Sequence, residues 1–284
     1  MTLRLLAPGD EPALETFLAG HADDSVLLRS NMREAGLVDR GEWLQGSYVA
    51  AFERGAIVGV AGHFWNGNII LQAPAHAGAV ACAAAQRSGR TVAGVLGPWE
   101  QMQSALCALG LADAPASKAA REGLYALDLA DLVVPAPLAG GRVTCRRARN
   151  DELDMIIAWH LDFTAETGGR PAGAADLMAL FQSRGTTWML EDGGRPVAFS
   201  AFSASLPDMV QVAAVWTPPA LRRRGYARAV VAGSLLAARR AGVRRAVLLA
   251  DLPAAVRAYE AIGFRRAGYY GMALLTEPRH AACD

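Results

Sequence analysis

The stretch that decides the fold is Val215-Trp-Thr-Pro-Pro-Ala-Leu-Arg-Arg-Arg-Gly-Tyr-Ala-Arg228. It begins at the end of the segment 209–217 (MVQVAAVWT), which predicts a strand, and Pro218-Pro219 stops that strand because proline has no N–H to donate. A long helix is predicted from about Ala227 and ends before Gly242. A loop that leads from a strand into a helix presents free amide groups and the positive end of the helix dipole, so it favours an anion.

The composition of this loop makes a diphosphate the natural occupant. Gly225 permits a positive φ or a close backbone approach, and the small Ala227 lets the loop close tightly. Positive charge around these two residues comes from Arg222, Arg223, Arg224 and Arg228. Taken alone, the three consecutive arginines would be better interpreted as a solvated charged run; it is their place between the strand and Gly225-x-Ala227 that favours the anion-binding interpretation.

Two motifs resemble those of the GCN5-related N-acetyltransferases, the GNAT family. Arg222-x-x-Gly225-x-Ala227 is similar to that family's Q/R-x-x-G-x-G/A signature. Downstream, Ala255-x-x-x-Tyr259-x-x-x-Gly263-Phe264 resembles a second landmark, a helix that ends in Gly-Phe. The resemblance covers about residues 140–276, and it implies that acetyl-CoA is the acyl donor.

The resemblance also implies roles for individual residues. The pantetheine arm would lie where the fourth and fifth strands splay apart, with the thioester carbonyl polarised by backbone N–H groups of the fourth strand. Tyr259, the expected catalytic residue, lies where the family often carries a tyrosine that protonates the leaving thiolate. Acetyl-CoA is expected to contact Val215, Trp216, Thr217, Arg222, Arg223, Arg224, Gly225, Tyr226, Ala227 and Arg228.

Two departures from the family leave the chemistry of the acceptor open. Leu252 stands where the family often has Asn, and the fourth strand carries Gln211 but no Glu that could act as a base. His160 and Glu166 are alternatives on the preceding helix, although a satisfied histidine in the core or on the surface is the simpler interpretation of His160. An aminoglycoside, an amino acid, a polyamine and a protein N-terminus all remain possible acceptors.

The rival hypothesis is a non-catalytic, acyl-CoA-binding regulatory protein that keeps the loop and lacks the acid and base. An arginine-loop nucleic-acid binder is disfavoured, because the net charge is only +1 and basic and aromatic residues do not interleave.

The order of predicted elements favours an α/β (α+β) protein made of two GNAT-like folds in tandem, each with a mixed, mostly antiparallel sheet flanked by helices. We expect a degenerate GNAT-like domain at 1–135 and an acetyl-CoA-binding GNAT domain at 140–284. The N-terminal half repeats the order weakly, but its third strand candidate, 68–72, is followed by Ala-Pro-Ala-His-Ala-Gly-Ala without arginine. That half is therefore interpreted as a scaffold or a substrate wall.

Composition limits the remaining classes. The chain has 284 residues, 52% of them hydrophobic, which is enough for two domains with real cores. Its four cysteines show no CxxC spacing, so no metal site is expected. Neither an apolar leader nor a long apolar run occurs, so we expect a cytoplasmic protein with no nucleic-acid or membrane partner. A monomer and a homodimer both remain open.

Overall fold

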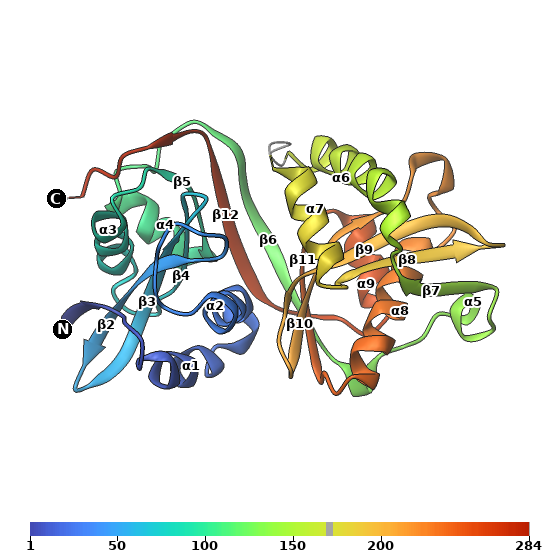
Figure 1. Cartoon of the computed structure of the whole chain (residues 1–284), viewed down its shortest axis with the longest axis horizontal. Coiled ribbons are helices and arrows are strands. Elements are labelled where there is room, and N and C mark those ends of the chain that lie inside the picture. The colour runs from blue at the N-terminus through green and yellow to red at the C-terminus, as the bar shows by residue number, and fades with distance from the viewer. Residues whose placement is uncertain (169–172, 284) are drawn as a thin grey trace. The chain divides into compact units, whose positions relative to one another are not determined.

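The computed structural model describes residues 1–168 and 173–283 (Figure 1). Its internal contacts divide the chain into two compact units. The N-terminal unit comprises Met1–Glu122 together with Gly268–Asp284, and the C-terminal unit comprises Gly123–Ala267. Two strands, β6 (Ala116–Asp128) and β12 (Arg265–Arg279), run across the boundary between the units.

The C-terminal unit follows the element order that the sequence predicts between residues 142 and 264. Its strands besides the end of β6 are β7 (Val143–Arg147), β8 (Thr187–Asp192), β9 (Arg195–Ser205), β10 (Met209–Trp216) and β11 (Arg245–Ala250). Its α-helices are α5 (Ala136–Ala139), α6 (Leu153–Thr167), α7 (Ala174–Ser183), α8 (Tyr226–Arg240) and α9 (Pro253–Glu260), with short 3-10 turns η1 (Leu129–Asp131), η2 (Asn150–Glu152) and η3 (Pro219–Leu221).

The strands of this unit form one mixed sheet. Its order is β7-β8-β9-β10-β11-β6, and only the β10–β11 pair is parallel. That parallel pair follows from the chain path, because α8 connects β10 to β11 as a crossover.

Helices cover both faces of the sheet (Figure 1). We call the core on one face the α6–α7 core; it consists of Ile156, Met178, Phe181, Met189, Phe199, Ala201, Ala214 and Trp216. The core on the other face contains the buried side of α8, together with Tyr259 and Phe264 around α9. Alternating side chains of β8 to β10 serve the two cores, as expected for strands with both faces covered.

The last strand corrects the predicted domain boundaries. The sequence places 269–275 with the C-terminal half, but Tyr270–Leu274 of β12 pair antiparallel with β5 (Val92–Pro98) in the N-terminal unit. The edge beside β11 in the C-terminal unit is taken instead by Gly123–Asp128 of β6. Each sheet is therefore completed by a strand that the sequence assigned to the other half of the chain: β12 in the N-terminal unit and β6 in the C-terminal unit. The predicted ranges 1–135 and 140–284 differ from the observed division for this reason.

The N-terminal unit repeats the same plan. Its remaining strands are β1 (Thr2–Leu5), β2 (Gly46–Glu53), β3 (Ala56–Phe64) and β4 (Asn68–Gln72), and its helices are α1 (Glu11–Ala19), α2 (Ala22–Ala35), α3 (Ala77–Ser88) and α4 (Trp99–Ala108). The sheet order is β1-β2-β3-β4-β5-β12, with β4 and β5 parallel.

Helix α2 has no counterpart in the sequence prediction. It buries polar residues such as Ser25, Arg29 and Asn31 along with apolar ones, so it lacks the clean apolar stripe that signals an amphipathic helix. Its backbone is tied to the sheet, because the Tyr48 hydroxyl donates a hydrogen bond to the Leu28 carbonyl.

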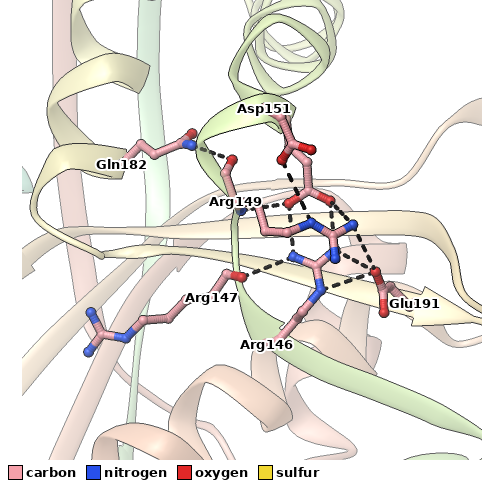
Figure 2. Close-up of polar contacts among 7 residues, drawn as sticks. Arg146, Arg147, Arg149, Asp151, Gln182 and Glu191 are labelled. Atoms are coloured by element: carbon pink, nitrogen blue, oxygen red, sulfur yellow. Dashed lines mark hydrogen bonds and ion pairs between the residues drawn. The ribbon is translucent and has the colours of Figure 1, made fainter.

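An ion-pair network fixes the start of α6 in the C-terminal unit (Figure 2). Arg146 on β7 donates two hydrogen bonds to Glu152, at 2.8 and 2.6 Å, and also pairs with Glu191 on β8. Glu152 accepts the Arg149 N–H at 2.7 Å, while the Gln182 side chain on α7 donates to the Arg149 carbonyl. These bonds to the charged form lower the pKa of Glu152, with Arg146 the largest cause. They join both helices of this face to the sheet.

Two chain-wide observations complete the description. The four cysteines, Cys82, Cys107, Cys145 and Cys283, are free thiols. Throughout residues 1–168 and 173–283, every helix is too short or too polar to cross a membrane.

Candidate functional site

Strands β10 and β11 separate toward their C-terminal ends. They pair from Met209 with Arg245 to Val212 with Leu248, and within the described residues the register goes no further. Leu249 and Ala250 continue to pair only with β6 on the other side. The second half of β10 therefore has main-chain groups that no β11 residue satisfies.

A β-bulge lies in that second half of β10. Ala213 pairs with Ala201 and Trp216 with Phe199, which leaves Ala214 and Val215 opposite the single residue Ser200 on β9. Ala214 has φ of 48°, an uncommon conformation for a residue with a side chain. Bulges of this kind redirect main-chain groups out of the ladder and often border active sites. The bulge and the strand separation occur together, immediately before the arginine loop.

The arginine loop turns the chain into α8 through two residues with positive φ. Arg223 has φ of 65°, and Gly225, the residue that precedes the helix, has φ of 80°. The first bond of the helix runs from the Ala229 N–H to the Gly225 carbonyl at 3.1 Å. The N–H groups of Tyr226, Ala227 and Arg228 therefore have no acceptor inside the helix. Together with the helix dipole, these groups would favour an anion. We call this position the anion site, and the binding of an anion there stays a prediction.

Comparison with known proteins agrees with this geometry. Residues 153–264 match the model of the acetyltransferase (GNAT) family. This segment is a GNAT acetyltransferase domain. A search of curated protein sequences gives no match for the chain.

Solved structures extend the likeness of fold to both units. A GCN5-related N-acetyltransferase from Kribbella flavida is 18% identical with a TM-score of 0.57, and the match covers 92% of this chain and 96% of that one. One from Sphaerobacter thermophilus is 14% identical with a TM-score of 0.59, over 96% and 94%. A tandem GNAT protein from the clavulanic acid biosynthesis pathway is 12% identical with a TM-score of 0.55, over 96% and 97%. The predicted fold class, two GNAT-like folds in tandem, is confirmed.

Within the GNAT domain, Arg222 points away from the anion site. Its Nε donates to the Thr217 carbonyl at 3.0 Å, and its Nη2 contacts both carboxylate oxygens of Glu166, at 2.9 and 3.0 Å. The guanidinium carbon also lies 4.6 Å from the centre of the Trp216 ring. Arg222 thus connects the arginine loop to the end of α6. Glu166, which the sequence offered as a residue of the acceptor pocket, is the partner of Arg222 in this ion pair.

The other loop arginines are exposed. Within the described part of the chain, no carboxylate forms an ion pair with Arg223, Arg224 or Arg228. Arg228 folds back over the glycine: its Nε would lie 3.1 Å from a Cβ placed on Gly225. Of the four predicted loop arginines, these three are the ones available to an anion.

The side chain of Tyr226 has a structural role in the GNAT domain, whereas the sequence predicted only a contact between this residue and acetyl-CoA. Its side chain is buried, and its hydroxyl donates a 2.5 Å hydrogen bond to Asp192 at the end of β8. This bond fixes the start of α8 against the sheet, so only the main chain of Tyr226 faces the anion site. Similarly, the side chain of Trp216 belongs to the α6–α7 core, which leaves its backbone for a ligand.

Tyr259 lies on α9, the helix that follows β11. Its ring is 8% exposed and makes an edge contact with Phe264, with 6.2 Å between the ring centres. Burial raises the pKa of the Tyr259 phenol above its usual value, so the group is protonated at neutral pH. Among the described residues, none forms a hydrogen bond with this hydroxyl. The phenol proton is thus available to a ligand, although its predicted catalytic role stays a prediction.

In the N-terminal unit, the segment between β4 and α3 corresponds to the arginine loop, and its polar groups are bonded to other residues of that unit. The Ala73 N–H, just after β4, donates to the Gln101 side chain at 2.6 Å. His76, the residue before α3, pairs with Glu53 at 2.6 Å. The segment carries no arginine. A glutamine that satisfies the amide after the strand was not recognisable in the sequence, because Gln101 lies 28 positions away.

Proposed function

We propose that the C-terminal unit is an N-acetyltransferase that binds acetyl-CoA at the arginine loop and transfers the acetyl group to an amine. The observation that carries this proposal is the combination of separated strands β10 and β11 with a loop of free amides beside them. In a GNAT domain, this arrangement offers one end of an acyl-CoA an anion site and the other end a gap between strands. The acceptor is a small-molecule or peptide amine.

The diphosphate of the donor would be held by the main chain from Arg223 to Arg228. Three free N–H groups at the start of α8 and the helix dipole attract an anion, while Arg223, Arg224 and Arg228 add full charges. Arg222 contributes indirectly, since it ties Thr217 and Glu166 together and so keeps the loop closed.

The bulge in β10 would act on the thioester. Val215 to Thr217 lie beyond the last residue of β10 that pairs with β11, so their backbone N–H groups are suited to hydrogen-bond the carbonyl oxygen, where negative charge develops as an amine attacks. Acetyl-CoA supplies the acetyl group as a thioester. The amine nitrogen forms the new C–N bond, the C–S bond breaks, and the sulfur leaves with the electron pair.

Tyr259 would supply the proton that the leaving sulfur needs. Its hydroxyl is protonated and has no partner among the described residues, so it is able to donate. The attacking nitrogen gives up one proton in the same reaction, so the proton count balances.

A specific observation favours one rival, a non-catalytic acyl-CoA-binding regulator. Strand β10 carries Gln211 rather than a carboxylate, and the exposed Leu252 immediately precedes α9, at a position where the GNAT family often has Asn. Such a protein would bind CoA and transfer nothing.

A measurement of thiol release from acetyl-CoA distinguishes the N-acetyltransferase from the non-catalytic regulator. The full-length protein is incubated with acetyl-CoA and a panel of amines, comprising amino-acid amides, a polyamine, an aminoglycoside and a peptide with a free N-terminus. We expect free CoA to appear in proportion to an acetylated product with at least one amine. Tight acetyl-CoA binding with no release for any amine would favour the regulator instead.

A further inference from the structure

The N-terminal unit has a pocket at the opposite end of β4 from the segment that corresponds to the arginine loop. It lies where the turn between β3 and β4 meets the start of β5 and the end of β12, all within that unit. Its volume is about 380 Å³, inside the range of roughly 300–1,000 Å³ that is usual for small-molecule sites. The polar lining residues are Asn66, Arg90 and Thr91, beside Trp65, Ala93 and Pro278.

Hydrogen bonds and close packing hold the walls of this pocket in place. Arg90 donates to both carboxylate oxygens of Asp39, each at 2.6 Å, and Asp39 also accepts the Ser47 hydroxyl at 2.6 Å. These bonds join the loop before β2 to the residues before β5. Gly67 has φ of 75°, and a Cβ on it would lie 2.9 Å from the Thr91 carbonyl oxygen. The β3–β4 turn therefore packs directly on the segment that leads into β5.

The pocket has no net charge. Arg90 is the one charged residue among the described residues that line it, and its guanidinium is paired with Asp39. Burial acts to raise the pKa of Asp39, but hydrogen bonds from Arg90 and Ser47 outweigh burial and hold that pKa at about 2. The carboxylate is thus ionised at neutral pH and balances the guanidinium. An anionic ligand would meet Asp39 as well as Arg90, so a neutral ligand is favoured.

The polar groups that remain free in the pocket are mainly donors. Asn66 Oδ1 accepts the Asn68 N–H at 3.1 Å, which leaves the side-chain NH2 group of Asn66 for a ligand. Arg90 bonds Asp39 through its two terminal nitrogens, which leaves its Nε–H. The Thr91 hydroxyl, which can donate or accept, has no partner in the described part of the chain.

The main-chain acceptor at the pocket is already occupied. The Gly67 carbonyl accepts the Ala93 N–H at 2.6 Å and also lies 3.2 Å from His63 Nε2. A ligand rich in N–H groups would find few acceptors here, whereas a ligand that presents oxygen atoms would match the free donors.

The indole ring of Trp65 is the aromatic wall of the pocket. Trp43, in the loop before β2, contacts this ring, with 4.9 Å between the ring centres, and is itself 39% exposed. Ala93 and Pro278 add apolar surface. Tryptophan is common in binding sites because it offers a large, rigid apolar face. A flat apolar wall beside hydrogen-bond donors suits a ring with C–H groups on one face and oxygens at its edge.

We propose that this pocket of the N-terminal unit binds a neutral sugar ring, with the C–H face of the sugar on the indole of Trp65. The sugar oxygens would accept hydrogen bonds from Asn66, Arg90 and Thr91. Each sugar hydroxyl accepts such a bond and turns its own proton toward water, so no donor is left unpaired. The site belongs to a different unit from the anion site, and the proposal does not depend on acetyl transfer.

Saturation-transfer NMR on the full-length protein tests this proposal. The probes are the methyl glycosides of glucose, galactose, mannose and N-acetylglucosamine, with adenine as a flat, N–H-bearing ring for comparison. The variants are Trp65→Ala, Trp65→Phe and Thr91→Val. Thr144→Val, at an exposed position of β7 in the other unit, is the matched control. Thermal unfolding is recorded for each variant.

We expect at least one glycoside to bind, with the strongest saturation transfer to the protons on one face of its ring, and adenine not to bind. Binding should be lost in Trp65→Ala and retained in part in Trp65→Phe. Thr91→Val should weaken it roughly 2- to 10-fold, the effect of one hydrogen bond, and Thr144→Val should leave it unchanged.

Three results would overturn the proposal: no binding of any of the glycosides to the folded wild-type protein, glycoside binding that Trp65→Ala and Thr91→Val leave unchanged, or binding of adenine in preference to every glycoside. If Trp65→Ala does not fold, the comparison of Trp65→Phe and Thr91→Val with the wild type decides. Thiol release enters none of these measurements, so failure here leaves the proposed function intact.

Discussion

Gly225→Asp is expected to weaken CoA binding by at least roughly 100-fold. The glycine adopts φ of 80°, a conformation that side chains disfavour, and a Cβ there would lie 3.1 Å from Arg228 Nε. A carboxylate at this point would also occupy the start of α8, where the diphosphate is proposed to bind. Two like charges about 4 Å apart repel by about 4 kcal/mol at an effective dielectric constant near 20, and each 1.4 kcal/mol is a factor of ten.

Titration calorimetry with CoA measures this change directly. The matched control is Gly194→Asp in the turn between β8 and β9, where φ is also positive, at 76°, and a Cβ would meet no atom within 4 Å. It introduces the same backbone strain and the same charge away from the loop. Equal CoA affinity in the two variants would place the diphosphate elsewhere.

Tyr259→Phe is expected to lower kcat by roughly 10²-fold while CoA affinity stays close to that of the wild type. The substitution keeps the ring, its burial and its edge contact with Phe264, and it removes only the hydroxyl. Since no residue of the described chain bonds to that hydroxyl, its loss should disturb no internal hydrogen bond. Steady-state thiol release and calorimetry separate the two quantities.

Tyr125→Phe is the control for this substitution. Tyr125 is fully buried in the same unit, and its hydroxyl accepts a hydrogen bond from Arg266 at 2.9 Å. We expect a loss of thermal stability and no change of kcat. Should Tyr259→Phe instead turn over normally and melt earlier, Tyr259 is a packing residue, and the thiolate takes its proton from water.

The sequence predicted the local structure of the site well, because the residue types in the loop are themselves typical of a strand end, a turn and a helix start. Two prolines end β10, Gly225 occupies a position that needs positive φ, and arginines surround the helix start. Such signals depend only on residues that are neighbours in the sequence, so they can be recognised without knowledge of the tertiary fold.

Features set by distant residues were not predictable in this way. The roles of Arg222 and Tyr226 depend on Glu166 and Asp192, which lie 56 and 34 positions away. The bulge at Ala214 has no sequence signal, since alanine is not a residue that favours positive φ.

The exchange of closing strands was missed for a related reason. A strand's residues indicate how its two faces alternate, but they do not say which free edge it will join. Nothing in 269–275 distinguishes pairing with β5 from pairing with β11. Helix α2 was missed because tertiary packing buries its polar residues, which overrides the pattern expected of an amphipathic helix.

The central claim is that the main chain between Arg223 and Arg228 holds the diphosphate of acetyl-CoA. Hydrogen–deuterium exchange of the full-length protein, with and without saturating CoA, tests it most directly, because the N–H groups of Tyr226, Ala227 and Arg228 have no acceptor within the helix. We predict that CoA slows exchange in peptides spanning 222–230, while peptides spanning 72–80 of the N-terminal unit are unchanged. Unaltered exchange at 222–230 in protein saturated with CoA, or protection at 72–80 instead, would contradict the account.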